Sequence, residues 1–175
     1  SNFATAVVDG VSGKARDFNG TNDYVQIDTS PILGSLTTNT VEAWVKLDAL
    51  GTNKTIYGEG NSGGAHFYFL YITNGNIARF QMYDVSLTCN AAGSTTLTTG
   101  RWYHITGVRN GSNCYVYVDG SQDGSGSGNP GALTLNSVRI GDLDNNGSHS
   151  YFNGSIDEVK ISDVARSAEE IAETY

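Results

Sequence analysis

The chain has 175 residues, which is enough for one domain with its own core and too short for two comfortable ones. Its formal charge of −8 at pH 7 repels phosphate backbones, so no nucleic acid is expected as a partner. No run approaches the roughly 18 apolar residues of a membrane-spanning helix, so no membrane insertion is expected either. We therefore treat residues 1–175 as a single domain.

Composition and hydrophobic pattern both indicate strands. Only 16% of the residues are charged and 22 are glycine, which suits many strands joined by tight turns. Apolar residues recur with period two almost everywhere, as in strands with one face on a core and the other in water. Ten short strands in one domain predict an all-β sandwich or barrel. The predicted strands cover residues 24–27, 40–47, 55–58, 66–72, 77–83, 85–89, 102–109, 114–118, 137–140 and 158–161.

Turn residues separate several of these strands. The pairs Asn74-Gly75, Asn110-Gly111 and Asp119-Gly120 supply the positive φ angles of hairpins, so the flanking strands are predicted to be antiparallel neighbours. The segment 121–131, SQDGSGSGNPG, is predicted from its composition to be a flexible loop. Near the C-terminus, Ser167 and Glu170 have the spacing of a capping box, which predicts a short helix after it.

The two cysteines, Cys89 and Cys114, can form one disulfide bond or none. Neither lies in a CxxC pair or near a histidine, as metal and redox sites require. We predict that they are bridged, on neighbouring strands, rather than present as two buried thiols. A disulfide bond places the domain in an oxidising compartment, so a secreted or cell-surface location is expected.

Two acidic segments are candidates for a calcium site. Residues 17–24, DFNGTNDY, place oxygen-bearing side chains around a glycine, and residues 154–158, GSIDE, precede the last predicted strand. The first and last strands of a sandwich commonly pair, which would bring the two segments together. Calcium takes six to eight oxygen ligands, some of them carboxylates. On spacing alone, an Asx turn that caps a hairpin explains the first segment at least as well.

Six runs occur in a fixed order: DFNGTNDYVQI, TVEAWVKL, RWYHITGVRN, YVYVDG, RIGD and YFNGSIDEVKISDVARSAEEI. From about residue 11 to the end, the chain resembles the laminin G-like domains of the concanavalin A-like lectin and glucanase superfamily. The resemblance implies a two-sheet antiparallel jelly-roll sandwich, of the kind appended to many surface proteins and polysaccharide-degrading enzymes. It also implies a structural Ca²⁺ held by Asn19, Asn22, Asp23 and Asp157. The family usually has Asp where this chain has Asn19, which removes one formal charge.

The same superfamily includes glucanases, which use paired carboxylates on one sheet face. Retaining glycosidases need two such groups roughly 5 Å apart. No predicted strand carries such a pair, and Glu42 stands alone in TVEAWVK. The histidines His66, His104 and His149 lie in separate segments, so no Ser-His-Asp arrangement can be drawn. We therefore predict that the domain is not an enzyme.

Carbohydrate binding needs aromatic faces that stack on sugar rings, and polar groups for the hydroxyls. The aromatic run at 67–71 must place some rings on the wet face of its strand. The stretch 142–152, DLDNNGSHSYF, is polar and ends in aromatic residues, although a variable solvent loop explains it equally well. The candidate ligand-binding residues are Tyr71, Asp142, Asp144, Asn146, His149 and Tyr151.

These features together predict a non-catalytic, calcium-stabilised module of a larger surface protein or polysaccharide-active enzyme. Its expected partner is a glycan or polysaccharide. The alternative is a protein-binding adhesion module on the same scaffold, with a protein receptor as partner. The sequence does not separate these two functions.

Overall fold

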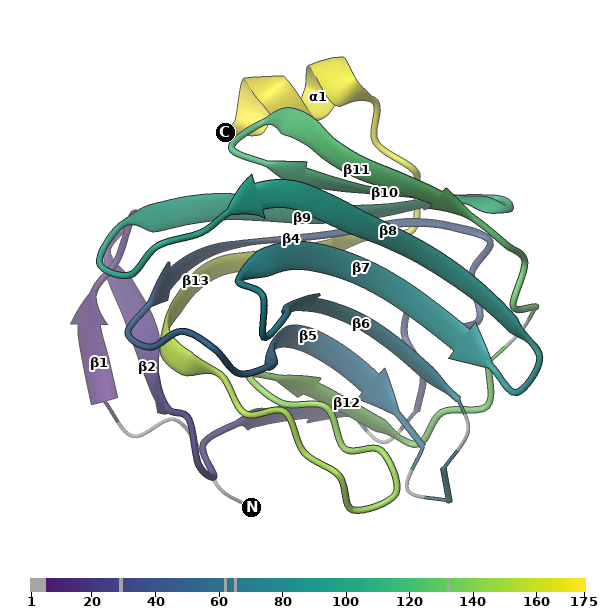
Figure 1. The fold of residues 1–175 in the computed structure, drawn as a ribbon, viewed down its shortest axis with the longest axis horizontal. Helices are drawn as coiled ribbons and strands as arrows, with labels where there is room; N and C mark the ends of the chain where they lie inside the picture. The colour runs from purple at the N-terminus through teal and green to yellow at the C-terminus, as the bar shows by residue number, and fades with distance from the viewer. Residues whose placement is uncertain (1–5, 29, 62, 65, 132) are drawn as a thin grey trace.

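The computed structural model describes residues 6–28, 30–61, 63–64, 66–131 and 133–175. Its strands form two antiparallel sheets that face each other across one core, and a short helix follows the last strand (Figure 1). The predicted all-β sandwich with a C-terminal helix is therefore confirmed.

One sheet has seven strands and the other has six. The seven-stranded sheet contains, in spatial order, β1 (Ala6–Asp9), β2 (Lys14–Asn19), β13 (Asn153–Ser162), β4 (Thr38–Leu47), β9 (Trp102–Asn110), β10 (Asn113–Val118) and β11 (Ser121–Ser127). The six-stranded sheet contains β3 (Val25–Asp28), β12 (Ser137–Ile140), β5 (Lys54–Gly60), β6 (Phe67–Ile72), β7 (Ile77–Asp84) and β8 (Leu87–Thr96). The order within each sheet mixes strands from distant parts of the sequence, as jelly rolls do.

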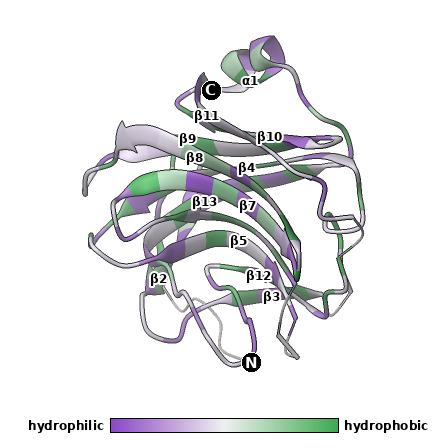
Figure 2. Ribbon diagram, turned by 45° about the vertical axis from the view of Figure 1, so that its right-hand side comes forward, coloured by the Kyte–Doolittle hydropathy of each residue, from purple (hydrophilic) through white to green (hydrophobic). Residues whose placement is uncertain are grey.

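The core lies between the inner faces of the two sheets. Alternate residues of each central strand point into it, because successive side chains of a strand face opposite sides. From β4 these are Val41, Ala43, Val45 and Leu47, and from β7 they are Ala78, Phe80 and Met82. The remaining residues of β7 therefore lie on the outer face of the six-stranded sheet. The colours along β7 alternate accordingly between hydrophilic and hydrophobic (Figure 2).

Cys89 of β8 and Cys114 of β10 form the predicted disulfide bond. Their strands belong to different sheets, so they are neighbours across the core rather than within one sheet. The hairpins β6–β7 and β9–β10 are also confirmed as antiparallel pairs, whereas the Asp119-Gly120 turn joins β10 to β11, a strand that was not predicted. In the β6–β7 hairpin, however, the positive φ belongs to Asn76 and not to Asn74 or Gly75. The loop is one residue longer than a two-residue turn, since the Thr73 N–H donates to the Ile77 carbonyl.

The prediction of a flexible loop at 121–131 is wrong, because residues Ser121–Ser127 form β11. The glycines of this strand alternate, and each faces the backbone of β8 in the opposite sheet. A Cβ on Gly124 would overlap the Ala92 carbonyl oxygen, and one on Gly126 would overlap the Asn90 carbonyl oxygen. Glycine is therefore used here for close packing between the sheets and not for flexibility.

The strands at the two ends of the chain also differ from expectation. β1 and β2 lie before the first predicted strand, and β13 begins at Asn153 rather than at residue 158. β8 runs on to Thr96, beyond the predicted end at residue 89. The first predicted strand, now β3, pairs with β12, whereas the neighbour of β13 at this end of the sheet is β2.

The C-terminal helix α1 (Ala168–Thr174) packs on the outer face of the seven-stranded sheet. Its predicted capping box is confirmed: the Glu170 N–H donates to the Ser167 hydroxyl, and the Ser167 N–H donates to the Glu170 carboxylate. Ile171 is buried against Val108 of β9 and Tyr117 of β10. None of the helices in the described part of the chain is long and apolar enough to cross a membrane.

Candidate ligand-binding face

The outer face of the six-stranded sheet carries aromatic and polar side chains in neighbouring rows. On β6, Tyr68, Leu70 and Ile72 belong to the core, so Phe67, Phe69 and Tyr71 point outward. Their partners on β7 are Tyr83, Gln81 and Arg79, in that order. Directly paired residues share one face of a sheet, so these six side chains form a continuous surface.

The rings on this face are ordered by stacking. Phe69 and Tyr71 are stacked with centroids 3.9 Å apart, and both are almost fully buried. Phe67 stacks on Tyr83 across the strands at 5.1 Å, and both of these rings remain half-buried. The pair Phe67 and Tyr83 is therefore the aromatic surface that a ligand can reach.

Polar groups with planar, directional hydrogen bonding lie beside the rings. The Arg79 guanidinium donates to the Tyr71 hydroxyl over 3.3 Å, and that hydroxyl donates to the Gln81 amide oxygen over 3.2 Å. Burial raises the pKa of Tyr71, so its hydroxyl stays protonated at neutral pH. On β8, Asn90 pairs with Gln81 and is exposed. An arginine and two amides thus face solvent next to two rings, and the buried Tyr71 hydroxyl is hydrogen-bonded to two of these three polar side chains.

The stretch 141–152 lies across β5 and bounds this surface on one side. Gly58 and Gly60 of β5 face it, and a Cβ on either would overlap the Asp142 or Asp144 carbonyl oxygen. Leu143 packs against Phe69 and Tyr71 from this stretch. The two alternating glycines of β5 therefore allow the polypeptide to lie directly on the sheet.

The acidic residues of this stretch are fixed by Arg139. Arg139 of β12 donates to Asp142 over 2.7 Å and to Asp144 over 2.9 Å. Asp142 is fully buried and also accepts from the Ser150 N–H, while His149 Nδ1 lies 2.8 Å from its second oxygen. Asp142 therefore holds the loop together, and its carboxylate has no surface left for a ligand.

The other predicted ligand residues of the stretch remain accessible. His149 stacks on Tyr151 with centroids 4.9 Å apart, and the Arg139 guanidinium lies over the Tyr24 ring at 4.2 Å. Burial, followed by the nearby Asp142 charge, raises the pKa of Tyr151. Asn146 is exposed at the tip, with a positive φ. The structure thus brings Asp142, Asp144, His149 and Tyr151 together, and it places Tyr71 on the neighbouring sheet surface.

Sequence reasoning missed Arg79, Gln81, Asn90 and Tyr83. All four lie on strands that it identified at least in part, so the missing information was the register of the hairpins. A two-residue turn at Asn74-Gly75 would pair Tyr71 with Ala78, and a slip of one residue reverses the faces. The alternation of apolar residues in β7 is the signal that could have corrected it, because Ala78, Phe80 and Met82 belong to the core.

The four predicted calcium ligands do not converge on one point. Asn19 Oδ1 accepts from the backbone N–H groups of Thr21, Asn22 and Asp23, which is an Asx turn. Asp157 accepts from the Val11, Ser12 and Glu158 N–H groups instead. Asn19 pairs with Asn153, so Asp157 lies four residues further along β13, about 13 Å at the usual rise per residue.

These residues therefore do not fit a single shared calcium ion, whose ligand distances are about 2.3–2.6 Å. Over the residues that the structure describes, no group of three or more His, Cys, Asp or Glu side chains could hold a metal. The antiparallel pairing of β2 with β13 does bring the two acidic segments side by side, as predicted, but in a register that separates their side chains. Calcium binding itself stays a prediction.

Glu42, the isolated strand carboxylate, lies on the outer face of the other sheet. Both of its oxygens accept from the Arg166 guanidinium, at 2.9 and 3.0 Å. His104 lies beside it, with Nε2 3.6 Å from the Glu42 carboxylate, and is itself buried. This carboxylate anchors the C-terminal segment to the sheet and has no second carboxylate facing it among its described contacts.

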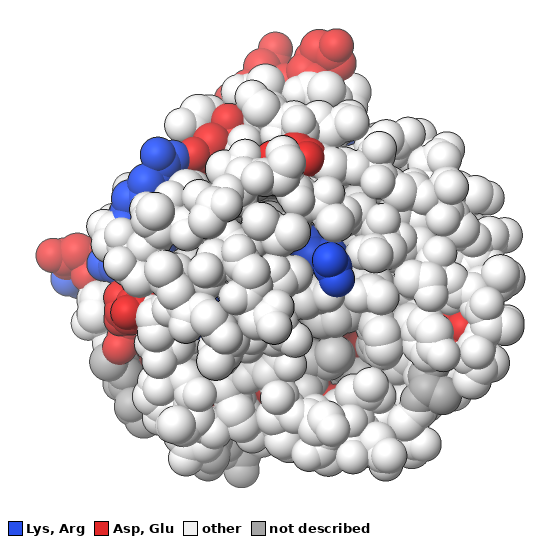
Figure 3. Space-filling model, in the orientation of Figure 1, with Lys and Arg blue, Asp and Glu red and all other residues white. Residues whose placement is uncertain are grey.

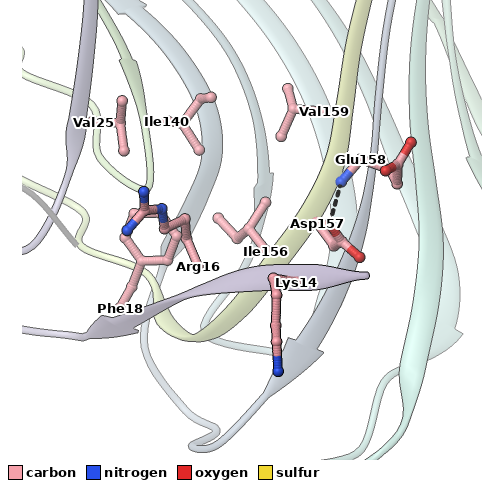
Figure 4. Close-up of a pocket in the computed structure, with 9 residues that line it drawn as sticks. All are labelled: Lys14, Arg16, Phe18, Val25, Ile140, Ile156, Asp157, Glu158 and Val159. Atoms are coloured by element: carbon pink, nitrogen blue, oxygen red, sulfur yellow. Dashed lines mark hydrogen bonds between the residues drawn. The ribbon is translucent and has the colours of Figure 1, made fainter. Parts of the chain in front are cut away.

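A hollow of about 170 Å³ opens between the two sheets, where β2 and β13 face β3 and β12 (Figure 4). Phe18, Val25, Ile140, Ile156 and Val159 form its apolar lining, with charged side chains around them. Its one aromatic ring, Phe18, is buried and cannot stack on a sugar ring. We therefore place the candidate ligand site on the outer face of the six-stranded sheet.

Residues 19–172 match the family described as the concanavalin A-like lectin/glucanases superfamily. The chain belongs to this family. The resemblance of the six sequence runs is thereby confirmed. A search of curated protein sequences gave no match.

Several solved structures are similar to this member of the superfamily. Domain 4 of AbnA, a GH43 extracellular arabinanase from Geobacillus stearothermophilus solved with arabinotriose, is 23% identical with a TM-score of 0.77, over 96% of this chain and 79% of that one. The CBM40 of Ruminococcus gnavus IT-sialidase, bound to α2,3-sialyllactose, is 13% identical with a TM-score of 0.74, over 91% and 97%. A heptameric SAP-like pentraxin from Limulus polyphemus is 18% identical with a TM-score of 0.67, over 89% and 78%. At these identities the likeness shows the fold.

Proposed function

We propose that this domain is a non-catalytic carbohydrate-binding module whose ligand lies on the outer face of the six-stranded sheet. The observation that carries the proposal is the ordered surface of Phe67 and Tyr83 next to Arg79, Gln81 and Asn90. Aromatic rings stack on the apolar faces of sugars, and planar polar side chains bind their hydroxyls in pairs. This face is also mainly uncharged (Figure 3), as suits a polyhydroxylated ligand.

The comparisons support the same class of ligand. A similar domain of an arabinanase was solved with arabinotriose, and a sialidase CBM40 with sialyllactose. Both are parts of larger enzymes, so we infer that this domain likewise holds a larger protein near a glycan or polysaccharide. The disulfide bond favours a secreted or cell-surface location, because such bonds persist in oxidising compartments.

The test is binding to a glycan array by the domain and by Tyr83→Ala. Loss of one stacking ring is expected to weaken binding by about tenfold, equivalent to roughly 1.4 kcal/mol. Tyr175→Ala removes an exposed ring on the outer face of the other sheet and serves as the matched control. An array without any bound glycan, together with tight binding to a protein receptor, would instead support the adhesion module. Turnover of a polysaccharide by the isolated domain would contradict both functions.

Calcium dependence belongs to the same proposal and is tested separately. The Asn19 to Asp23 turn supplies oxygen atoms, but those of Asn19 already accept backbone hydrogen bonds. Binding on the array with calcium and with chelator would show whether the ion matters for the ligand. Equal binding in both conditions would remove calcium from the proposed function and leave the carbohydrate site unchanged.

A further inference from the structure

The chain is strongly acidic, and most of its exposed or half-buried basic side chains are paired with a carboxylate. These pairs are Lys14 with Asp9, Arg101 with Asp119, Arg139 with Asp142 and Asp144, Lys160 with Glu158, and Arg166 with Glu42. Arg79 is different. Among the described residues no carboxylate forms an ion pair with it, and its hydrogen-bond acceptor is the neutral Tyr71 hydroxyl. Its positive charge is therefore left uncompensated on the candidate ligand face.

The Arg79 guanidinium is held in position by its hydrogen bond to Tyr71. Tyr71 is held by stacking on Phe69, and its hydroxyl accepts from one terminal nitrogen of the guanidinium. The Nε atom of Arg79 is buried and has no hydrogen-bond partner in the described structure. Its neighbour on β8 is Ala92, whose side chain carries no hydrogen-bond acceptor. Donor groups of a preorganised guanidinium thus remain without acceptors.

Figure 3 shows a basic group near the middle of this face, surrounded by uncharged side chains. Arg79 is the only basic residue of β7, and its pairing with Tyr71 places it on this outer face. Asp142 and Asp144 are already bound by Arg139, and Asp123, which lies beside Gly93 of β8, accepts hydrogen bonds from Ser94 and Thr95. An acidic ligand group would therefore meet Arg79 without an internal competitor.

We propose that the ligand contains an acidic sugar, whose carboxylate is bound by Arg79. This inference rests on the proposed carbohydrate-binding function. A guanidinium matches a carboxylate with two parallel hydrogen bonds, and this pairing is among the strongest in proteins. The Tyr71 hydroxyl keeps the guanidinium in place, and Gln81 and Asn90 lie next to it for the neighbouring hydroxyls. A uronic or sialic acid unit has this chemistry. With a neutral sugar, the free N–H groups of Arg79 would have no carboxylate acceptor and would be hydrated instead.

The experiment compares matched probes that differ only in the acid group. Trigalacturonate is measured against galactotriose, and sialyllactose against its carboxyl methyl ester, by calorimetry at low and at physiological salt. At least one acidic probe is expected to bind tenfold or more tightly than its neutral partner, and the advantage is expected to shrink as salt screens the charges. Arg79→Gln should reduce the ratio between acidic and neutral probes to about one. Arg79→Lys should keep part of it, because lysine retains the charge but not the paired geometry.

Arg16→Gln is the matched control, since Arg16 is an exposed arginine on β2, in the other sheet. It should leave the preference for acidic probes unchanged. Every variant compared should have the same melting temperature as the unaltered domain, so that a loss of binding does not reflect unfolding. Tighter or equal binding of the neutral probes would overturn the acidic-sugar proposal and leave the carbohydrate-binding function standing. Absence of binding to every glycan, acidic or neutral, would contradict the proposed function itself.

Discussion

Cys89 on β8 is covalently joined to Cys114 on β10, with Cα atoms 6.2 Å apart, so the bond connects the two sheets through the core. The bridge closes a loop with a sequence separation of 25 residues. In the chain-entropy account, such a loop restricts the unfolded state and stabilises the fold by roughly 3 kcal/mol. The double variant Cys89→Ser, Cys114→Ser should lose about this amount in urea denaturation. A variant as stable as the oxidised protein would contradict the expectation, as would free thiols in native mass spectrometry.

β11 gives a second prediction about stability. Gly126 faces the Asn90 carbonyl oxygen of the opposite sheet, and no space for a Cβ exists there. Gly126→Ala should therefore force the sheets apart and cost about 1–3 kcal/mol in thermal or urea denaturation. Ser125→Ala is the control, because Ser125 is the exposed neighbour on the other face of β11. Equal stability of the two variants would mean that residues 121–127 behave as the loop that composition indicates.

The central hairpins could be read from the sequence, because period-two patterns and turn residues are local signals. β11 could not, since SQDGSGSG has the composition of a linker and its strand conformation depends on the backbone of β8 that packs on it. β2 was missed for a related reason. Its residues 14–19, KARDFN, have little apolar alternation, and the strand is fixed by pairing with β13 at the far end of the chain.

The candidate site was predictable only in part. The sequence identified the stretch 142–152 from its polar and aromatic composition, but it gave no way to see that Asp142 is buried beneath Arg139 and Ser150. A calcium site inferred from two acidic segments likewise depends on register, which the family resemblance did not supply. Arg79 escaped notice because a single arginine on a strand is usually an ordinary solvent-facing residue. Its place beside Tyr71 and Gln81 on the outer face, without a carboxylate partner among the described residues, depends on the three-dimensional pairing of β6 with β7.

The lowered pKa of the buried His104 side chain predicts that the stability of the fold depends on pH. Burial, followed by the nearby Lys160 charge, lowers the pKa of His104 to about 4 from its ordinary value of 6.5. The unfolded chain therefore binds a proton more readily than the folded one. The contribution of neutral, buried His104 to the free energy of unfolding is complete above pH 6.5 and is lost as the pH falls toward 4. Between pH 7 and pH 5 the loss should be about 2 kcal/mol. His104→Gln should show a correspondingly smaller decrease in urea denaturation over that range. Parallel pH profiles for the two proteins would contradict this assignment.

Replacing Asp157 distinguishes a structural role of its carboxylate from a role as a calcium ligand. Its carboxylate accepts from the Val11, Ser12 and Glu158 N–H groups, at 2.8, 3.2 and 2.9 Å, and so anchors the β1–β2 turn to β13. Asp157→Ala removes hydrogen bonds to a charged group and leaves backbone donors unpaired, which should cost about 2–4 kcal/mol. Because these contacts involve no metal, thermal and urea denaturation should show the same loss in calcium and in chelator.

Two further variants make the Asp157 test specific. Gly10→Ala should destabilise the protein in the same way, because a Cβ on Gly10 would overlap the Asp157 carboxylate. Asp48→Ala removes an exposed carboxylate in the turn after β4 and should have little effect. A loss of stability in Asp157→Ala that occurs only when calcium is present would contradict the structural role. It would instead support the shared calcium site predicted from the family resemblance, with Asp157 turned toward the Asn19 to Asp23 segment in the loaded protein.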